Sequence, residues 1–203
     1  MSAAERRGAA VRRLIDLARR PTGRPQGRLL RDPRAGRIVA VIECVLNQNA
    51  RDEGAATSPA LNRDVLRLCS EHAVGIVQIP CPEMRALGLA RVRPPGASIR
   101  EALDTDAGRR CCRRISVETA ARLQDYARSG VVVLAVLGGN AQSPGCAVHN
   151  GPGGLLPSSG ILMRELQDEL RRRGLELPFL AMCDADPPAL AADIDRLAAL
   201  FDH

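Results

Sequence analysis

The sequence predicts an α/β fold of the three-layer, Rossmann-like kind, with an open parallel sheet of about four to five strands and helices on both faces. Short apolar runs alternate with stretches of helical periodicity along the chain, and this order is typical of a parallel sheet covered by helices. The chain has 203 residues, 45% of them hydrophobic. It is therefore long enough to bury the core that such a fold requires.

The N-terminal part of the chain differs from the rest. Residues 3–20 have a helical pattern, and the stretch from 21 to 36 is rich in proline, glycine and arginine, as linkers are. Residues 1–37 hold eleven arginines against three acidic residues, so the net charge of +6 belongs to this arm. We expect an arginine-rich helix and linker over 1–36, followed by a single α/β domain over 37–203.

Within that domain, apolar runs predict four strands and 3.6-residue periodicity predicts four helices. Ser58 before Pro59 and Asp186 before Pro187 are typical of helix starts, and a glycine follows the end of two predicted helices. In chain order we expect strand 37–43, helix 59–72, strand 74–79, helix 113–129, strand 131–137, helix 159–173, strand 177–182 and helix 187–201.

The amino-acid composition excludes several classes of protein. All 29 basic residues are arginine, so the chain has no lysine for a Schiff base or for a phosphate-binding loop. The longest apolar run, Val131–Leu137, is too short to cross a membrane, and the N-terminus lacks the apolar region of a signal peptide. We expect a cytoplasmic protein with no membrane partner. Two phenylalanines and one tyrosine offer little surface on which bases could stack, which favours a solvated arm over one that binds nucleic acid.

Four of the seven cysteines follow predicted strands. Cys44 comes directly after the first strand, Cys81 after the second, Cys146 in a glycine-rich loop after the third, and Cys183 after the fourth. Ligands of open α/β sheets bind outside the carboxyl ends of the strands. In a reducing compartment, cysteines gathered there are interpreted as metal ligands or redox groups.

Other interpretations of the cysteines stay open at this point. A lone cysteine is usually a small buried hydrophobic residue, and Cys69 on the apolar side of its helix is expected in the core. Cys111 and Cys112 lie in a charged stretch, where either is a candidate exposed thiol. The wide spacing of the other cysteines is not a local zinc signature, although thiolates also suit zinc.

Polar side chains near these cysteines are further candidates for the site. Glu83 and Ser143 are candidate catalytic groups or make ordinary loop hydrogen bonds, and Asn47 and Asn49 are candidates for substrate binding or ordinary turn formers. The neighbouring polar groups with the same two interpretations are Glu43, Gln48 and His149.

Three motifs carry a resemblance to a known family. The segments Cys44–Asn49, Ile79–Glu83 and Ser143–Cys146 contain CVLNQN, IPCPE and SPGC, and Gly88–Arg91 is GLAR. Together they resemble the thiouracil desulfidase family, particularly the related desulfidases with CVLN, PCPE and SPSCG motifs. The likeness runs from about residue 37 to about residue 182 and leaves out the arginine-rich arm.

The resemblance implies an enzyme with a 4Fe-4S cluster. The cluster would be held by Cys44, Cys81 and Cys146, and its open iron would take the sulfur of a small thiocarbonyl compound while water supplies the oxygen. Ser143 would lie near the substrate, and Glu83 is our choice for the carboxylate that moves protons.

One motif departs from the family pattern. The last segment continues as SPGCA where relatives have SPSCG, so a hydroxyl near the ligand is lost and Ala147 has to avoid a positive φ. The alternative function is a non-catalytic iron-sulfur or zinc protein, acting in sensing or electron transfer, whose basic arm contacts nucleic acid. In that case Cys183 would close the site as a fourth ligand. A redox protein using Cys111 and Cys112 is a third interpretation, although the chain lacks CxxC.

Overall fold

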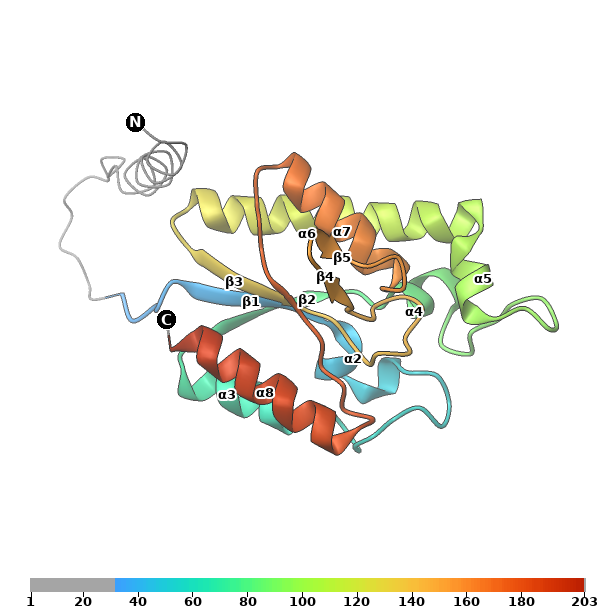
Figure 1. The fold of residues 1–203 in the computed structure, drawn as a ribbon, viewed down its shortest axis with the longest axis horizontal. Coiled ribbons are helices and arrows are strands. Elements are labelled where there is room, and N and C mark those ends of the chain that lie inside the picture. The colour runs from blue at the N-terminus through green and yellow to red at the C-terminus, as the bar shows by residue number, and fades with distance from the viewer. Residues whose placement is uncertain (1–31, 203) are drawn as a thin grey trace.

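A four-stranded parallel sheet forms the centre of the structure, a computed structural model that describes residues 32–202 (Figure 1). Its strands are β1 (Arg37–Ile42), β2 (Gly75–Ile79), β3 (Val132–Leu137) and β6 (Phe179–Leu180), in the order β2-β1-β3-β6. All neighbouring strands run parallel. The predicted α/β fold is therefore confirmed.

Helices cover both faces of this sheet. The long helices α6 (Asp106–Arg128) and α7 (Ile161–Arg172) lie on one face, and α3 (Arg63–Glu71) and α8 (Pro187–Phe201) lie on the other (Figure 1). The central strand β1 is buried between the two layers, and the side chains from Val39 to Ile42 have no exposed surface. Such burial on both faces explains why β1 is a continuous apolar run rather than an alternating one.

The register of the strands brings their carboxyl ends level with one another. Ile42 of β1 pairs with Ile79 of β2, and Val41 pairs with Leu137 of β3. The segments that leave β1, β2 and β3 therefore start at the same edge of the sheet. Two short helices begin there, α2 (Glu43–Leu46) and α4 (Pro82–Leu87).

The remaining elements are short. A 3-10 turn, η1 (Gln48–Ala50), follows α2, and α5 (Ile99–Asp104) precedes α6. Strands β4 (Asn150–Gly151) and β5 (Gly154–Leu155) form a small antiparallel hairpin. Among the described residues, no helix is long and apolar enough to cross a membrane.

Two predicted helix starts are wrong. The first predicted helix begins at Arg63 rather than at 59, because the Asn62 side chain caps it by accepting from Val65 N at 3.1 Å. The second begins at Asp106 rather than at 113, with Thr105 as its cap. The predicted start after Asp186 is confirmed, as are the two glycines that follow α6 and α7 with positive φ.

The predicted helix over 3–20 lies outside the described residues, as does most of the predicted linker. Strand β6 is shorter than the predicted 177–182, and α4, α5 and the β4-β5 hairpin were not predicted. These elements contain few apolar residues each, so they carry little periodicity.

Candidate functional site

A cavity of about 440 Å³ lies at the carboxyl edge of the sheet and is lined by Cys44, Cys81 and Cys146. Its walls come from the segments that follow β1, β2 and β3, together with the loop after α4. The structure thus brings together three of the four cysteines that follow predicted strands.

Each cysteine is held by a different element. Cys44 lies in the short helix α2, Cys81 is the residue before α4, and Cys146 lies in the loop after β3. Their exposed fractions are 9%, 4% and 3%, so all three sulfurs are nearly enclosed. The backbone N–H of Cys81 donates to the Glu43 carboxylate at 2.8 Å, which fastens the start of α4 to the segment that carries Cys44.

Glycine lets the backbone lie directly against two of the sulfurs. A Cβ at Gly139, just after β3, would lie 2.8 Å from Cys146 Sγ and 3.6 Å from Cys44 Sγ. A Cβ at Gly145 would lie 2.6 Å from Pro82 Cγ, so a serine there would require Pro82 to shift. The contact between Gly145 and Pro82 is therefore a physical reason why this chain has SPGC, with glycine at 145, in place of SPSC. The non-glycine residues with positive φ do not include Ala147, as expected.

The remaining cysteines lie away from the cavity lining. Cys69 is buried in the core, as predicted. Cys111 and Cys112 are buried within α6, so the interpretation of either as an exposed thiol is wrong. Their helix turns them inward although arginines flank them on both sides. Cys183 is half-buried beside Asp193, whose carboxylate accepts from its backbone N–H at 2.9 Å.

Ser143 and Glu83 form a hydrogen-bonded pair beside Cys146. The Ser143 hydroxyl donates to Glu83 Oε1 at 3.0 Å and lies 3.1 Å from Cys146 Sγ. It also accepts from the backbone N–H of Cys146 at 3.1 Å. Both side chains line the cavity. A hydroxyl placed between a carboxylate and a thiol can pass a proton in either direction.

Asn47 and Asn49 lie outside the cavity lining. Both are exposed, and Asn47 Oδ1 accepts from the backbone and side chain of Asn49 at 3.1 and 3.0 Å. Asn47 is thus the cap of η1. His149 is similarly occupied, since its Nε2 bonds to the Ala141 carbonyl at 2.9 Å.

A buried ion pair that the sequence pattern does not reveal ties the loops together. Asp184, which follows β6, accepts from Arg51 at 2.7 Å, from Gln48 at 3.0 Å and from Asn140 at 3.1 Å. Gln48 also donates to the carbonyl of Cys44 at 3.0 Å. Asp184 therefore links the segments after β1, β3 and β6. Its position beside Cys183 at a strand exit is the one signal in the sequence that points to it.

A hydrogen bond between Cys44 and Cys146 shifts the pKa values of those two thiols, and burial raises the pKa of Cys81 to about 12. A hydrogen bond to Cys44 and burial raise the pKa of Cys146, whereas the same hydrogen bond lowers the pKa of Cys44. The pair therefore shares its protons, with Cys146 as the donor and Cys44 as the sulfur that more readily becomes a thiolate.

Cys44, Cys81 and Cys146 are the residues that could hold an iron-sulfur cluster or a metal ion. Three soft sulfur donors face one cavity, and Gly139 leaves open the space beside two of them. Within residues 32–202, no three His, Cys, Asp or Glu side chains are arranged to hold one ion.

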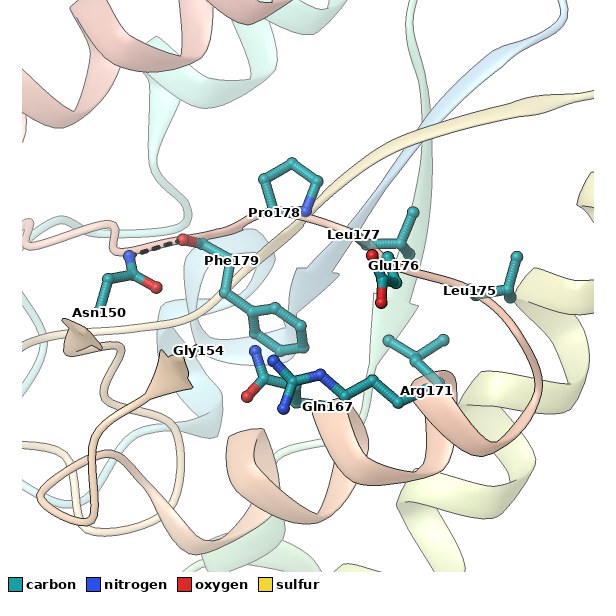
Figure 2. Close-up of a pocket in the computed structure, with 10 residues that line it drawn as sticks. Asn150, Gly154, Gln167, Arg171, Leu175, Glu176, Leu177, Pro178 and Phe179 are labelled. Carbon is teal, nitrogen blue, oxygen red and sulfur yellow. Dashed lines mark hydrogen bonds between the residues drawn. The ribbon is translucent and has the colours of Figure 1, made fainter. Parts of the chain in front are cut away.

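A second pocket, of about 340 Å³, lies beside β6 and the β4-β5 hairpin (Figure 2). Gln167 and Arg171 of α7 extend beneath the ring of Phe179, and Asn150 donates to the Phe179 carbonyl at 3.0 Å. Gln167 and Arg171 are themselves bonded to the hairpin backbone. These polar groups hold the hairpin in place, and the residues lining the pocket include neither a cysteine nor a histidine.

The chain is similar to an uncharacterised protein of the archaeon Methanocaldococcus jannaschii. The two are 26% identical over 136 residues, which make up 67% of this chain and 79% of the relative. No family model and no solved structure matches the chain significantly. The site itself, rather than a named relative, therefore has to support any assignment of function.

Proposed function

We propose that this protein is a cytoplasmic desulfidase that removes sulfur from a small thiocarbonyl compound with the help of a 4Fe-4S cluster. One observation supports the proposal. Three buried cysteines, which follow three neighbouring strands, line one cavity together with Ser143 and Glu83. In the reaction, the oxygen of water replaces the sulfur of C=S, the sulfur leaves as sulfide, and no electrons are gained or lost overall.

Cys44, Cys81 and Cys146 are the residues that would hold the cluster. Thiolates are the usual ligands of iron-sulfur clusters, and the other described cysteines, Cys69, Cys111, Cys112 and Cys183, do not line the cavity. With three protein ligands, a bound cluster supplies an open iron that can bind and polarise a soft thiocarbonyl sulfur.

Ser143 and Glu83 would move the protons of the reaction. The Glu83 carboxylate accepts from Ser143 Oγ at 3.0 Å and can take a proton from an attacking water. Ser143 lies close enough to Cys146 Sγ, at 3.1 Å, to orient a group beside that sulfur. The apolar wall formed by Ala50, Ile99 and Pro144 offers a surface for a flat substrate.

The test is anaerobic reconstitution of the purified chain with iron and sulfide, followed by measurement of bound iron and of sulfide released from 2-thiouracil and related thiocarbonyls. We expect the wild type to bind about four irons per chain. Cys44→Ala, Cys81→Ala and Cys146→Ala should each lose the cluster and the activity.

Two matched cysteine variants serve as controls. Cys69→Ala removes a buried cysteine of the core, and Cys183→Ala removes the cysteine beside Asp193. Both should keep the cluster and the release of sulfide. Loss of the cluster in Cys183→Ala, with no sulfide released by the wild type, would instead indicate a closed four-cysteine site for electron transfer or sensing.

A further inference from the structure

Arg91 is a cation that the fold buries beside the cysteine cavity. Its exposed fraction is 1%, and it is one of the cavity-lining residues. Its backbone has φ = 48°, in the left-handed region that side-chain-bearing residues rarely adopt. Strained backbone of this kind persists where the surrounding structure holds it and where function uses it.

Carbonyl groups from two segments hold the guanidinium in one orientation. One terminal nitrogen donates to the carbonyls of Gly88 and Leu89, at 2.9 and 3.1 Å, and the other donates to the carbonyl of Ala50 at 2.6 Å. That second nitrogen also lies 3.9 Å from Cys81 Sγ. The guanidinium is thereby fixed between the segment after β1 and the cysteine after β2.

The guanidinium of Arg91 has one carboxylate partner at long range. Its Nε forms an ion pair with Glu83 Oε2 at 3.6 Å, and this buried Nε has no hydrogen-bond partner. Carbonyl oxygens accept from the other N–H groups but carry no net charge. A buried cation is costly unless anions accompany it. The sulfur of Cys81, as a thiolate, would be a second anion beside the same guanidinium.

Each of the three sulfurs has a different polar neighbour. Cys81 Sγ faces the Arg91 guanidinium, and Cys146 Sγ faces the Ser143 hydroxyl. Cys44 faces Cys146, and the nearby Arg51 is already paired with Asp184 at 2.7 Å. Within residues 32–202, the side-chain contact between a cation and one of these sulfurs is therefore the one at Cys81, and Arg51 acts on Cys44 at longer range.

We propose that Arg91 is the counter-charge of the Cys81 thiolate and raises the reduction potential of the bound cluster. This inference rests on the proposed function, because it requires that the three cysteines hold a cluster. A fixed positive charge near a cluster favours the reduced, more negative form, and hydrogen bonds to the sulfurs act in the same direction. Arg91 would thus act through Cys81 and not by touching substrate.

The experiment compares the midpoint potential of the reconstituted cluster in the wild type, Arg91→Met, Arg91→Gln and Arg91→Lys. We expect Arg91→Met and Arg91→Gln to shift the potential to more negative values and to bind less iron. Arg91→Lys keeps the charge and should stay close to the wild type. Arg91→Gln removes the charge but keeps two N–H donors for the surrounding carbonyls. It therefore replaces Arg91→Met as the uncharged variant if Arg91→Met does not fold.

Arg164→Met is the matched control, because Arg164 in α7 also has a buried Nε without a partner but does not line the cavity. The midpoint potential of the cluster in Arg164→Met should equal that in the wild type. Equal potentials in all the Arg91 variants would overturn the role of Arg91 and leave the proposed function standing. A wild type that takes up no iron would overturn both, and iron content alone distinguishes the two failures.

Discussion

At the scale of single residues, the Ser143 side chain has three polar partners in the cysteine cavity. Its oxygen accepts from the backbone of Cys146, donates to Glu83 and lies 3.1 Å from Cys146 Sγ. These contacts fix the direction of the hydroxyl, since a donor, an acceptor and a sulfur surround it. A hydroxyl held in this way is ready to pass a proton without first reorienting.

Ser143→Ala tests this role. Because the change removes only the hydroxyl, we expect the cluster to be retained and the rate of sulfide release to fall by about 10²-fold or more, as when a proton-transfer group is removed. Bound iron and sulfide release are the measurements. Ser116→Ala, which removes a buried hydroxyl from α6, should leave both unchanged. Unchanged release in Ser143→Ala would contradict the role.

Gly139→Ala tests the space beside the sulfurs. The added Cβ would lie 2.8 Å from Cys146 Sγ, which is closer than van der Waals contact allows. We expect the variant to fold and to bind less than half of the wild-type iron after reconstitution. Gly153→Ala is the control, because a Cβ there meets nothing within 4 Å. Full iron content in Gly139→Ala would show that the sulfurs can move aside.

The sequence allows the cysteines of this site to be predicted, but not the arginines around them. A cysteine that directly follows an apolar strand is placed at the sheet edge by the strand itself, so Cys44 and Cys81 could be assigned from periodicity. Arg91 ends the GLAR segment that the resemblance includes, but it lies in an irregular loop where no periodicity indicates that its charge is buried. Its partners, the carbonyls of Ala50, Gly88 and Leu89, depend on the folded backbone and on no side chain.

At the scale of elements, helix starts depend on which side chain caps them. The sequence offers Ser58 before a proline, but the Ser58 hydroxyl instead donates to the Leu61 carbonyl at 2.9 Å. Asn62 provides the cap of α3, and its side chain is buried. Ser58 and Asn62 are both typical capping residues and lie four residues apart. Tertiary packing determines which of them caps the helix.

Asn62→Ala should therefore destabilise the fold by about 1 kcal/mol, the usual effect of losing a capping side chain. Chemical denaturation measures this difference in the free energy of unfolding. Pro59→Ala is the control, because Pro59 lies before the start of α3 and should change the stability by less than about 0.5 kcal/mol. The reverse order of effects would mean that the helix begins at 59 in solution.

The long elements of the fold follow from the sequence, and the short ones do not. Strands β1, β2 and β3 are runs of branched apolar residues, and α7 and α8 have apolar residues at helical spacing. Helix α6 begins before the predicted 113, because its first half also faces the core through Cys111, Cys112 and Ile115. Helices α4 and α5 have six residues each, too few for a helical period to stand out.

At the scale of the whole molecule, the carboxyl and amino ends of the strands differ in what lies beside them. The carboxyl edge carries the cysteine cavity, and Asp184 ties together the segments that leave β1, β3 and β6. The amino edge carries the attachment of the N-terminal arm, where Arg37 donates to the Phe201 carbonyl at the end of α8. The length of β1 separates the arm's attachment point from the cavity.

Removing residues 1–31 tests this separation. The strand pattern begins at Arg37, and Gly36, whose carbonyl accepts from Val132 N at 2.8 Å, stays in the shortened chain. We expect the free energy of unfolding to change by less than about 0.5 kcal/mol and iron uptake to equal that of the full chain. A stability loss of several kcal/mol would mean that the arm packs on the domain. Loss of a nucleic-acid interaction with the cluster intact would favour the sensor.

The meeting of cysteines from three neighbouring strands has a consequence for the order of assembly in the cell. Cys44, Cys81 and Cys146 lie far apart in the sequence, so these three thiols form no local group in an unfolded chain. Only after β1, β2 and β3 have paired are the three sulfurs close to one another. For a chain that binds a cluster as we propose, the three ligands are therefore in place only after the sheet has formed, and insertion of the cluster would follow folding.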